Sequence, residues 1–356
     1  MKIKQATQQY ERWLAKQTPL VSKDLTLKHA VMKRDAFSFL RATFYRWMQV
    51  WTEACVDVVG APLVLAVGDL HVENFGTWRD REGRLIWGIN DFDEASSLPY
   101  TNDLVRLAVS AKLAKQTDHL SIKAKHVYDA ILTGYAEGLR AGGRPFVLAE
   151  SHGWLRRVAT SKLRDPVQFW RKMDTLPPAT VVPVDARKAL ELLMPDEGLA
   201  FTIRRRVSGL GSLGRLRFVA LADWHGGKIA REAKALGPST CIWARNGQGP
   251  NTIMYQAMLD HAVRCRDPFV QVQGSWLVRR LSPYCSRIEL PSLPERRDEG
   301  KLLYAMGWET SNVHIGSRNA KDIQRDLFKR KADWLPLAAQ AMENATIMDW
   351  NDWTNT

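Results

Sequence analysis

Large apolar residues in the first part of the chain recur every three or four positions. Within residues 28–58 they fall at Phe37, Leu40, Phe44, Trp47, Met48 and Trp51. Side chains at this spacing share one face of an α-helix, so the pattern predicts a helix over 28–58 with one buried face. The same reasoning predicts helices near 102–116 and 121–141, and helical structure again from about 298 to 345.

Short continuous apolar runs predict two strands in the next part of the chain. Residues 62–67 and 85–89 are such runs, and the polar segment 79–84 between them has the composition of a hairpin turn. Polar residues follow each run directly. If the two strands pair as a hairpin, we expect these polar residues to converge in one cleft.

The period of the pattern changes after residue 198. Residues 142–198 read as helical with Pro and Gly breaks, and a further helix is expected at 252–264. Four later segments have the pattern of strands: 199–204, 216–221, 228–233 and 276–281. We therefore predict an α+β fold, with a helical lobe over 1–198, a small antiparallel β-rich lobe over 199–294, and helices over 295–356 that return to the helical lobe.

Composition narrows the class of protein. Of the 356 residues, 45% are hydrophobic and 25% are charged, a globular balance that excludes a disordered or fibrous protein. No apolar run reaches the roughly 18 residues of a membrane-spanning helix, and the N-terminal segment is too polar for a secretory signal. The 4 cysteines form no C-x-x-C pair. The sequence thus predicts a cytoplasmic protein with no membrane partner.

The net charge bears on the partners. A formal charge of +13 favours an anionic ligand, which could be a nucleotide, a phosphorylated metabolite or nucleic acid. The basic residues are dispersed along the chain, so a surface that is simply cationic explains the charge equally well. Choosing among these partners requires the chemistry of particular side chains.

Acidic and amide side chains gather after the two predicted strands. The first strand is followed by Asp69, His71, Glu73 and Asn74, and the second by Asn90, Asp91, Asp93 and Glu94. Carboxylates that share a cleft disfavour each other's ionisation unless a cation compensates them. Oxygen ligands of this kind suit Mg²⁺ or Mn²⁺. The alternative is that these residues cap helices and satisfy the backbone of loops.

The spacing of three of these residues indicates a reaction class. Asp69 and Asn74 are separated by four residues, and after an apolar strand Asp91 precedes Phe92. In phosphoryl transfer this order supplies an Asp that takes the acceptor's proton, followed by an Asn and a second Asp that hold metal ions. Asp69 is therefore predicted as the catalytic base, Asn74 and Asp91 as metal ligands, and Asp93 as an auxiliary ligand or supporting group.

A glycine-rich segment lies between two of the later strands. Gly209, Gly211 and Gly214 form a G-x-G-x-x-G pattern that also contains Ser212. A dinucleotide site would need a helix to begin at the third glycine, whereas the residues after Gly214 alternate as a strand does. We expect a glycine-rich hairpin that covers phosphates; a tight turn without a ligand is the alternative.

The motif GDLHVEN at 68–74 resembles the H-G-D-x-H-x-x-N catalytic loop of the protein-kinase-like superfamily, most closely its aminoglycoside phosphotransferase and choline kinase branch. INDFDEA at 89–95 resembles the metal loop of that branch, and Asp103 resembles its structural-anchor Asp. This resemblance implies a two-lobed kinase-like fold that uses ATP and Mg²⁺. It also implies a phosphate-pairing cation after the glycine loop.

Several residues are candidates for that cation and for the adenine site. Arg231, followed by Glu232, stands at the apparent position of the phosphate-pairing residue, with Lys228 and Lys234 nearby. The segment 276–281 is similar to the strand that leads to the adenine-binding hinge. The sequence leaves open which of the three basic residues contacts phosphate.

The order of these motifs predicts a circular permutation. A kinase places its glycine loop before its catalytic loop, whereas here the glycine-rich segment follows it by more than one hundred residues. The segment 300–316 resembles the helix that normally precedes the catalytic loop, so it should pack beside 63–68 and bring His314 near that loop. The segment 209–214 should face Asp91 across a cleft.

The chain also resembles a bacterial family known as domain of unknown function 2252. The residues that carry this resemblance are Lys28, Met32, Phe37, Phe39 and Arg41, followed by 68–76, 90–94 and 209–214. The resemblance implies a kinase-like fold and supplies no substrate.

These patterns lead to one expected function and three alternatives. We expect an ATP- and Mg²⁺-dependent phosphotransferase that acts on an unknown small-molecule or protein acceptor. One alternative is a catalytically impaired nucleotide-binding regulator, and a second is a nucleic-acid-binding regulator, both on the same scaffold. The third is a related enzyme that transfers AMP. The Arg–Glu pair at 231–232 and the positive charge motivate the two regulators.

Overall fold

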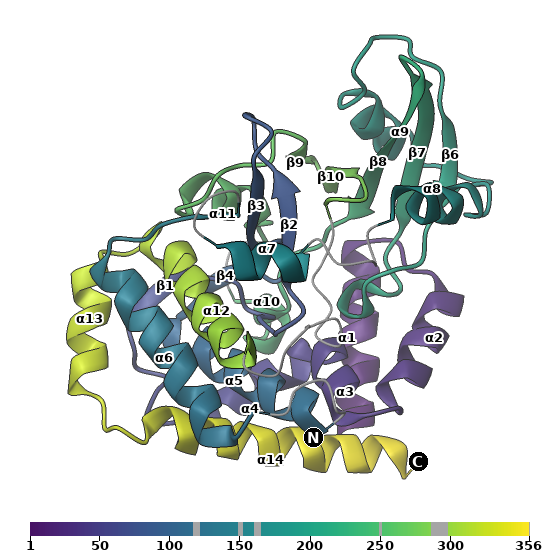
Figure 1. Ribbon diagram of the computed structural model, residues 1–356. Coiled ribbons are helices and arrows are strands. Elements are labelled where there is room, and N and C mark those ends of the chain that lie inside the picture. Colours follow the sequence, from purple (N-terminus) through teal and green to yellow (C-terminus); the bar gives the residue numbers. More distant parts are fainter. Residues whose placement is uncertain (117–121, 149–151, 160–164, 249–250, 286–297, 356) are drawn as a thin grey trace.

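The computed structural model describes residues 1–356 except 117–121, 149–151, 160–164, 249–250, 286–297 and 356 (Figure 1). Helices from both ends of the chain form the lower part of the molecule in this view, and α14 runs along its base. The strands β6, β7 and β8 project away from these helices together with α8 and α9. The helices are α1 (Ile3–Gln17), α2 (Ser22–Met32), α3 (Ala36–Ala42), α4 (Phe44–Ala54), α5 (Tyr100–Gln116), α6 (Ala124–Arg140), α7 (Gly153–Ala159), α8 (Pro166–Asp174), α9 (Val184–Glu191), α10 (Thr240–Ala244), α11 (Tyr255–His261), α12 (Asp298–Ile315), α13 (Ala320–Lys329) and α14 (Trp334–Thr354).

The segment 28–58 folds as parts of three helices, not as the single helix predicted from its periodicity. The break before α3 occurs at Asp35, whose Oδ1 accepts a hydrogen bond from the Ser38 N–H at 2.6 Å. An aspartate that accepts from the third residue of a helix is an N-cap, so the chain must begin a new helix there. The break between α3 and α4 lies at Thr43, whose backbone leaves helical geometry (φ −126°, ψ 37°).

The two strands expected to form a hairpin pair with other partners. β1 (Leu63–Ala66) pairs with β4 (Ser96–Pro99), and β3 (Leu85–Ile89) pairs with β2 (Phe75–Arg79) and with β5 (Phe146–Val147). The predicted pairing of 62–67 with 85–89 is therefore wrong, although the turn at 79–84 does join two paired strands. The sequence analysis does not predict β2, because its first four residues are all buried and the strand therefore lacks an alternation of apolar and polar residues.

The β-rich part of the chain forms one antiparallel sheet of five strands in the order β6-β7-β8-β10-β9. Its strands are β6 (Thr202–Arg205), β7 (Arg217–Trp224), β8 (Gly227–Ala235), β9 (Val270–Gln273) and β10 (Trp276–Leu281). α9 packs on one face, against Phe218 and Ala233, while Met173 of α8 packs with Val219 and Ala230 of the other face. Residues 286–294 of the predicted β-rich lobe lie outside the described residues.

Close helix packing joins the C-terminal part of the chain to the N-terminal part. α12 and α6 approach so closely that a Cβ at Gly134 would lie 1.9 Å from the backbone oxygen of Tyr304. On the other helix, a Cβ at Gly307 would lie 2.1 Å from the backbone oxygen of Ile131. Only glycine permits this backbone approach. As predicted, α12 also packs beside β1.

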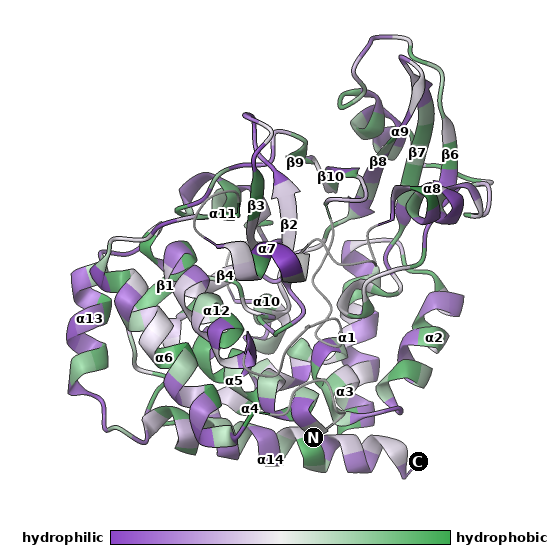
Figure 2. Ribbon diagram, in the orientation of Figure 1, coloured by the Kyte–Doolittle hydropathy of each residue, from purple (hydrophilic) through white to green (hydrophobic). Residues whose placement is uncertain are grey.

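The hydropathy of the outer helices fits their place at the surface. α13 and α14 carry hydrophilic and hydrophobic residues along their lengths (Figure 2). Leu335, Ala339 and Met342 of α14 are buried in the main core. In the part of the chain that the structure describes, no helix has both the length and the apolar character needed to cross a membrane.

Candidate functional site

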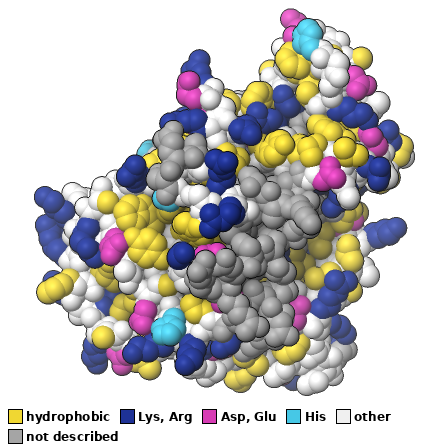
Figure 3. All heavy atoms as spheres, viewed as in Figure 1, with side chains coloured by type: hydrophobic (Ala, Val, Ile, Leu, Met, Phe, Trp, Pro, Cys, Tyr) yellow, Lys and Arg dark blue, Asp and Glu magenta, His cyan; other side chains and the backbone are white. Residues whose placement is uncertain are grey.

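A cavity of about 600 Å³ is lined by the helical part of the molecule and by residues of the five-stranded sheet. It is lined by Asp69, Asn74, Asp91 and Asp93 together with Gly209, Gly211 and Ser212. Lys and Arg side chains gather on the adjoining surface, between the β2–β3 hairpin and the sheet (Figure 3). The structure thus brings the two acidic loops and the glycine-rich segment together, as the sequence predicts.

Asp69 lies in the loop after β1 and is held by a buried arginine of α5. The Nε of Arg106 donates to Asp69 Oδ1 at 2.9 Å, and the Nη2 of Arg106 donates to Asp69 and to the Leu40 carbonyl. The guanidinium also stacks on the rings of Phe44 and Trp47. Burial raises the pKa of Asp69 to about 7, although Arg106 opposes this shift. A carboxylate with a pKa near neutrality is suited to act as a general base.

Asp103 of α5 holds the backbone of this loop in place through hydrogen bonds. The N–H groups of Val67 and Gly68 donate to the two oxygens of its carboxylate at 2.7 and 2.9 Å. His314 of α12 lies 3.0 Å from the same carboxylate, and its other ring nitrogen lies 2.8 Å from the Tyr135 hydroxyl. Asp103 thus holds the backbone before Asp69, and His314 approaches the same loop, as predicted.

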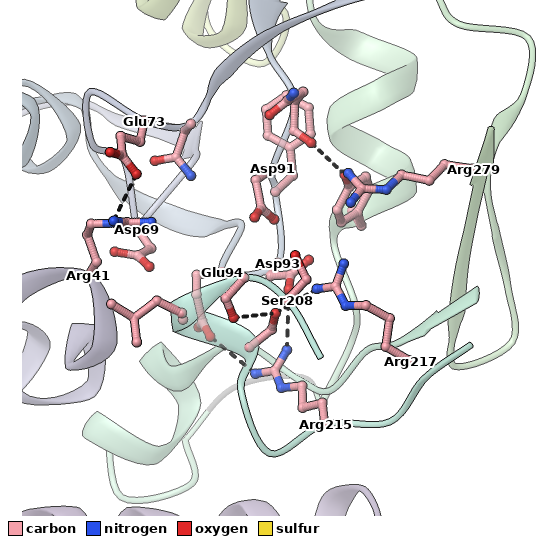
Figure 4. Close-up of a pocket in the computed structure, with 18 of the residues that line it drawn as sticks. Arg41, Asp69, Glu73, Asp91, Asp93, Glu94, Ser208, Arg215, Arg217 and Arg279 are labelled. Carbon is pink, nitrogen blue, oxygen red and sulfur yellow. Dashed lines mark hydrogen bonds and ion pairs between the residues drawn. The ribbon is translucent and has the colours of Figure 1, made fainter. Parts of the chain in front are cut away.

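The two acidic loops are joined through Asn74. Its Oδ1 accepts from the His71 N–H at 2.6 Å, which closes the first loop, and its carbonyl accepts from the Asn90 N–H at 3.0 Å. The neighbouring Glu73 forms an ion pair of 2.8 Å with Arg41 of α3. Arg41, Asp69 and Glu73 lie on one side of the cavity and Arg217 and Arg279 on the other, with Asp91 and Asp93 between them (Figure 4).

Asp91 and Asp93 share one ammonium group. Lys234 of β8 places its Nζ 3.3 Å from Asp91 Oδ1 and 2.5 Å from Asp93 Oδ1. Burial raises the pKa of Asp91, but Lys234 and Arg279 outweigh it and bring the pKa to about 2. Burial and the charge of Asp91 raise the pKa of Asp93. Asp91 is therefore ionised at neutral pH, and its side chain is 43% exposed.

The glycine-rich segment lies directly against the loop that carries Asp69. Gly209 has a φ of +79°, which favours glycine, and Ser212 Oγ accepts from the Nη2 of Arg217 at 2.8 Å. A Cβ at Gly211 would lie 3.4 Å from Asp69 Oδ2. Gly214 does not line the cavity; a Cβ there would lie 2.5 Å from a methyl carbon of Leu25 on α2. Gly214 therefore serves packing, whereas Gly209 and Gly211 lie at the cavity.

Glu232 is buried behind the cavity wall, where it holds three arginines. Its carboxylate pairs with Arg217 and Arg279 at 2.8 Å and with Arg206 at 2.5 Å. Burial opposes its ionisation, but these guanidinium groups hold the pKa of Glu232 well below its usual range. The three arginines line the cavity. Glu232 thus acts on the cavity by positioning positive charge.

Arg231, the residue predicted to pair with phosphates, is not among the residues that line the cavity. Successive side chains of a strand point to opposite faces. Glu232 and Lys234 do not line the cavity themselves, but they lie on the face of β8 whose side chains contact the cavity residues Arg217 and Asp93. Arg231 donates instead to the Leu193 carbonyl at 2.8 Å and stacks on Phe269. The basic residue of β8 that reaches the acidic loops is Lys234, which the sequence named only as a neighbour.

The donor set at Asp91 fits a magnesium ion that is bound together with phosphates. Among the described residues, no group of three or more His, Cys, Asp or Glu side chains could hold a metal ion by itself. Asp91, Asp93 and Asn74 offer carboxylate and amide oxygens, which Mg²⁺ prefers. Because Mg²⁺ usually binds one or two carboxylates, several waters and substrate phosphates, these residues suit a metal that enters with its substrate.

Three basic side chains at the candidate site were not predicted from the sequence. Arg106 and Arg217 lie within ordinary helix and strand patterns, so only their buried ion pairs reveal them. Lys28 had been noted only as part of the motif shared with the bacterial family, yet it is buried and lines the cavity. The spacing of Glu232 and Lys234, two residues apart on a strand, was a signal that could have placed Lys234 on the cavity face.

Comparison with known proteins relates part of the chain to a protein family. The chain matches no curated protein and no solved structure at a significant level. A family model matches residues 20–163. This region contains Lys28, both acidic loops and Asp103, and it ends before the glycine-rich segment. Over residues 20–163 the chain is similar to a family described as "Uncharacterized protein conserved in bacteria (DUF2252)".

Proposed function

We propose that this protein is a Mg²⁺-dependent phosphotransferase that transfers the terminal phosphoryl group of ATP to a hydroxyl group of an acceptor. The observation that carries the proposal is a single cavity lined by Asp69, Asn74, Asp91 and residues 209–212 of the glycine-rich segment. Such a combination of a base, metal ligands and a glycine-rich turn is what phosphoryl transfer requires. In this proposal the fold is a circularly permuted, two-lobed kinase-like fold.

Asp69 is the proposed base. Both hydrogen bonds from Arg106 fall on its Oδ1, so Oδ2 is the oxygen that faces Gly211 and the cavity. Oδ2 accepts the proton of the acceptor hydroxyl as its oxygen bonds to the terminal phosphorus. The bond between that phosphorus and the bridging oxygen breaks, and ADP leaves with that oxygen. Arg106 keeps the carboxylate oriented and partly ionised near neutral pH.

The cations on the other side of the cavity suit the remaining phosphates. Arg217 and Arg279 line the cavity and are fixed by the buried Glu232, so their charge is already oriented before a ligand binds. Preoriented charge of this kind stabilises a transition state without the cost of rearrangement. A magnesium ion held by Asp91 and its neighbours would neutralise charge on the phosphates.

One observation favours a second candidate, a nucleotide-binding regulator without catalysis. Lys234 lies 2.5 Å from Asp93 and 3.3 Å from Asp91, so an ammonium group already compensates the carboxylates proposed to bind the metal. In a regulator this pairing would persist when nucleotide binds. In an enzyme, the metal–nucleotide complex would displace the ammonium from Asp91, whose side chain is the more exposed of the two.

A turnover assay tests the proposal. Purified protein is incubated with Mg²⁺ and ATP labelled in the terminal phosphate, and the release of labelled phosphate to water or to protein is followed. Water can take the place of the acceptor hydroxyl at the terminal phosphorus, so we expect slow ADP formation that Asp69→Asn reduces at least about tenfold.

Two controls make the assay decisive. Asp349→Asn alters an ion pair with Arg46 that does not line the cavity, and it should leave the rate unchanged. Nucleotide binding without any ADP formation, label transfer or AMP transfer would favour the regulator. Transfer of labelled AMP from ATP labelled in the α-phosphate would instead identify the AMP-transferring alternative.

A further inference from the structure

Lys28 is a buried cation at the glycine-rich segment. It lies on α2, its residue is 4% exposed, and it is one of the residues that line the cavity. Its Nζ donates to the Gly211 carbonyl at 3.5 Å, a long hydrogen bond. Burial lowers the pKa of its ammonium group to about 8, so the group is mostly charged at neutral pH. A buried charge with so weak a partner is costly unless a ligand compensates it.

The other cations near Asp69 are compensated by carboxylates. Arg106 pairs with Asp69 and Arg41 pairs with Glu73. Lys28, in contrast, forms no ion pair with any carboxylate of the described residues. Its ammonium group donates a hydrogen bond to the neutral Gly211 carbonyl. Of these three cations near Asp69, Lys28 is therefore the one whose charge no carboxylate of the described residues neutralises in an ion pair.

The position of Lys28 ties this charge to the reacting centre. Gly211 contacts both groups: its carbonyl faces Lys28 Nζ, and a Cβ on it would lie 3.4 Å from Asp69 Oδ2. An anion bound by Lys28 would thus lie next to the oxygen proposed to accept the proton. Arg217 and Arg279 lie across the cavity from Asp69 (Figure 4), and both are paired with Glu232, whereas the hydrogen-bond partner of Lys28 is the Gly211 carbonyl.

We propose that Lys28 is the cation of a phosphate subsite at Gly211, beside Asp69. The ligand chemistry is a phosphate group, and it has two possible sources: the terminal phosphate of the nucleotide or a phosphate carried by the acceptor. The first source rests on the proposed function. The subsite itself does not, because it can bind inorganic phosphate whether or not nucleotide binds.

Three probes distinguish the sources: Mg–ATP, Mg–ADP and inorganic phosphate with Mg–ADP present. Each is titrated into the wild type, Lys28→Met and the control Lys23→Met, which changes an exposed lysine of the same helix. If the terminal phosphate is the source, Lys28→Met lowers the affinity for Mg–ATP about tenfold and leaves Mg–ADP unchanged. If the acceptor is the source, Lys28→Met leaves the ratio of the affinities for Mg–ATP and Mg–ADP unchanged, and it abolishes the binding of inorganic phosphate.

Other outcomes overturn the subsite or the function separately. The subsite is refuted if Lys28→Met matches the wild type both in the ratio of its affinities for Mg–ATP and Mg–ADP and in phosphate binding. If the wild type binds no nucleotide, the proposed function fails, and phosphate titrated into the nucleotide-free protein still tests Lys28.

The melting temperature of ligand-free Lys28→Met should equal or exceed that of the wild type, because an uncompensated buried charge is removed. Lys28→Gln provides the same comparison if Lys28→Met does not fold.

Discussion

His314 Nε2 lies 3.0 Å from a carboxylate oxygen of Asp103, and that carboxylate accepts the N–H groups of Val67 and Gly68. Helix α12 is thereby connected through two buried side chains to the loop that carries Asp69. The contact links residues more than two hundred positions apart. This connection shows how the C-terminal helices complete the site formed by the N-terminal part of the chain.

Replacing Asp103 should destabilise the fold and displace Asp69. Asp103→Ala leaves two buried N–H groups without acceptors, so the free energy of unfolding should fall by roughly 2–5 kcal/mol. Asp103→Asn keeps one acceptor oxygen and should cost less. Urea unfolding measures both variants. If Asp103→Ala is as stable as the wild type, Asp103 does not anchor the loop.

Arg106 should set the pH dependence of catalysis. Its charge lowers the pKa of Asp69, which burial raises to about 7, so the rate should rise with pH through a midpoint near 7. In Arg106→Met the opposing charge is lost, the pKa rises further, and the midpoint should move to about pH 8 or higher. Arg46→Met, which breaks an ion pair with Asp349 away from the cavity, is the control. A pH profile that is the same in Arg106→Met and the wild type would contradict this role.

The raised pKa of Asp69 also has a consequence for stability. Between about pH 4 and pH 7 the folded protein holds a proton on Asp69 that the unfolded chain, with a pKa of 3.8, has lost. Protons bound only by the folded state stabilise it, so this contribution is complete below pH 4 and is lost as the pH rises through 7. Denaturant unfolding of the wild type and Asp69→Asn across this range measures it. The difference in stability between the two proteins should depend on pH; a constant difference would contradict the shift.

Lys234 should compete with divalent cations for Asp91 and Asp93. Lys234→Met removes the nearest cation from both carboxylates and leaves Asp93 with the more distant Arg215 at 3.7 Å, so the free energy of unfolding should fall by about 3–5 kcal/mol. Millimolar Mg²⁺ should then raise the melting temperature of this variant more than that of the wild type. Lys228→Met changes an exposed lysine on the same strand, paired with Asp174, and should show no such effect. Equal responses to Mg²⁺ in all three proteins would argue against metal binding at these carboxylates.

Arg231 and Arg217 should behave differently when nucleotide binds. Arg231→Met removes a hydrogen bond to Leu193 and stacking on Phe269, so it should lower stability by about 1–3 kcal/mol while Mg–ATP affinity stays within about twofold. Arg217→Met removes a cavity cation and should weaken Mg–ATP binding about tenfold. Calorimetric titration compares them. A selective loss of affinity in Arg231→Met would restore the assignment made from sequence.

The sequence predicted local features of the site better than long-range pairing. Strands 85–89 and 276–281 have the predicted bounds because the local residue pattern of each is that of a strand. The partner of 62–67 was predicted incorrectly because strand pairing depends on distant residues, here Ser96–Pro99. The N-cap signal at Asp35 was available in the sequence. The break at Thr43 was hidden because the apolar spacing continues across it, with Leu40 of α3 and Phe44 of α4 both buried.

The same difference between local and long-range information applies to the side chains of the candidate site. Asp69, Asn74 and Asp91 were correctly expected to share one cavity, because chain-local spacing determines the loops that carry them; their proposed roles stay predictions. Arg231 was chosen over Lys234 because a linear comparison does not show which face of β8 each side chain occupies. Lys28 and Arg106 enter the site from helices, and their importance lies in buried charge, which appears only once the helices are packed.

The central claim is that the cavity between the acidic loops and the segment 209–214 binds a metal–nucleotide complex. Isothermal titration calorimetry of Mg–ATP against the wild type and Asp91→Asn tests it most directly. The account predicts binding to the wild type at a single site that requires Mg²⁺, weakened about tenfold or more in Asp91→Asn. Absence of binding to the wild type, or equal Mg²⁺-independent binding to both proteins, would contradict it.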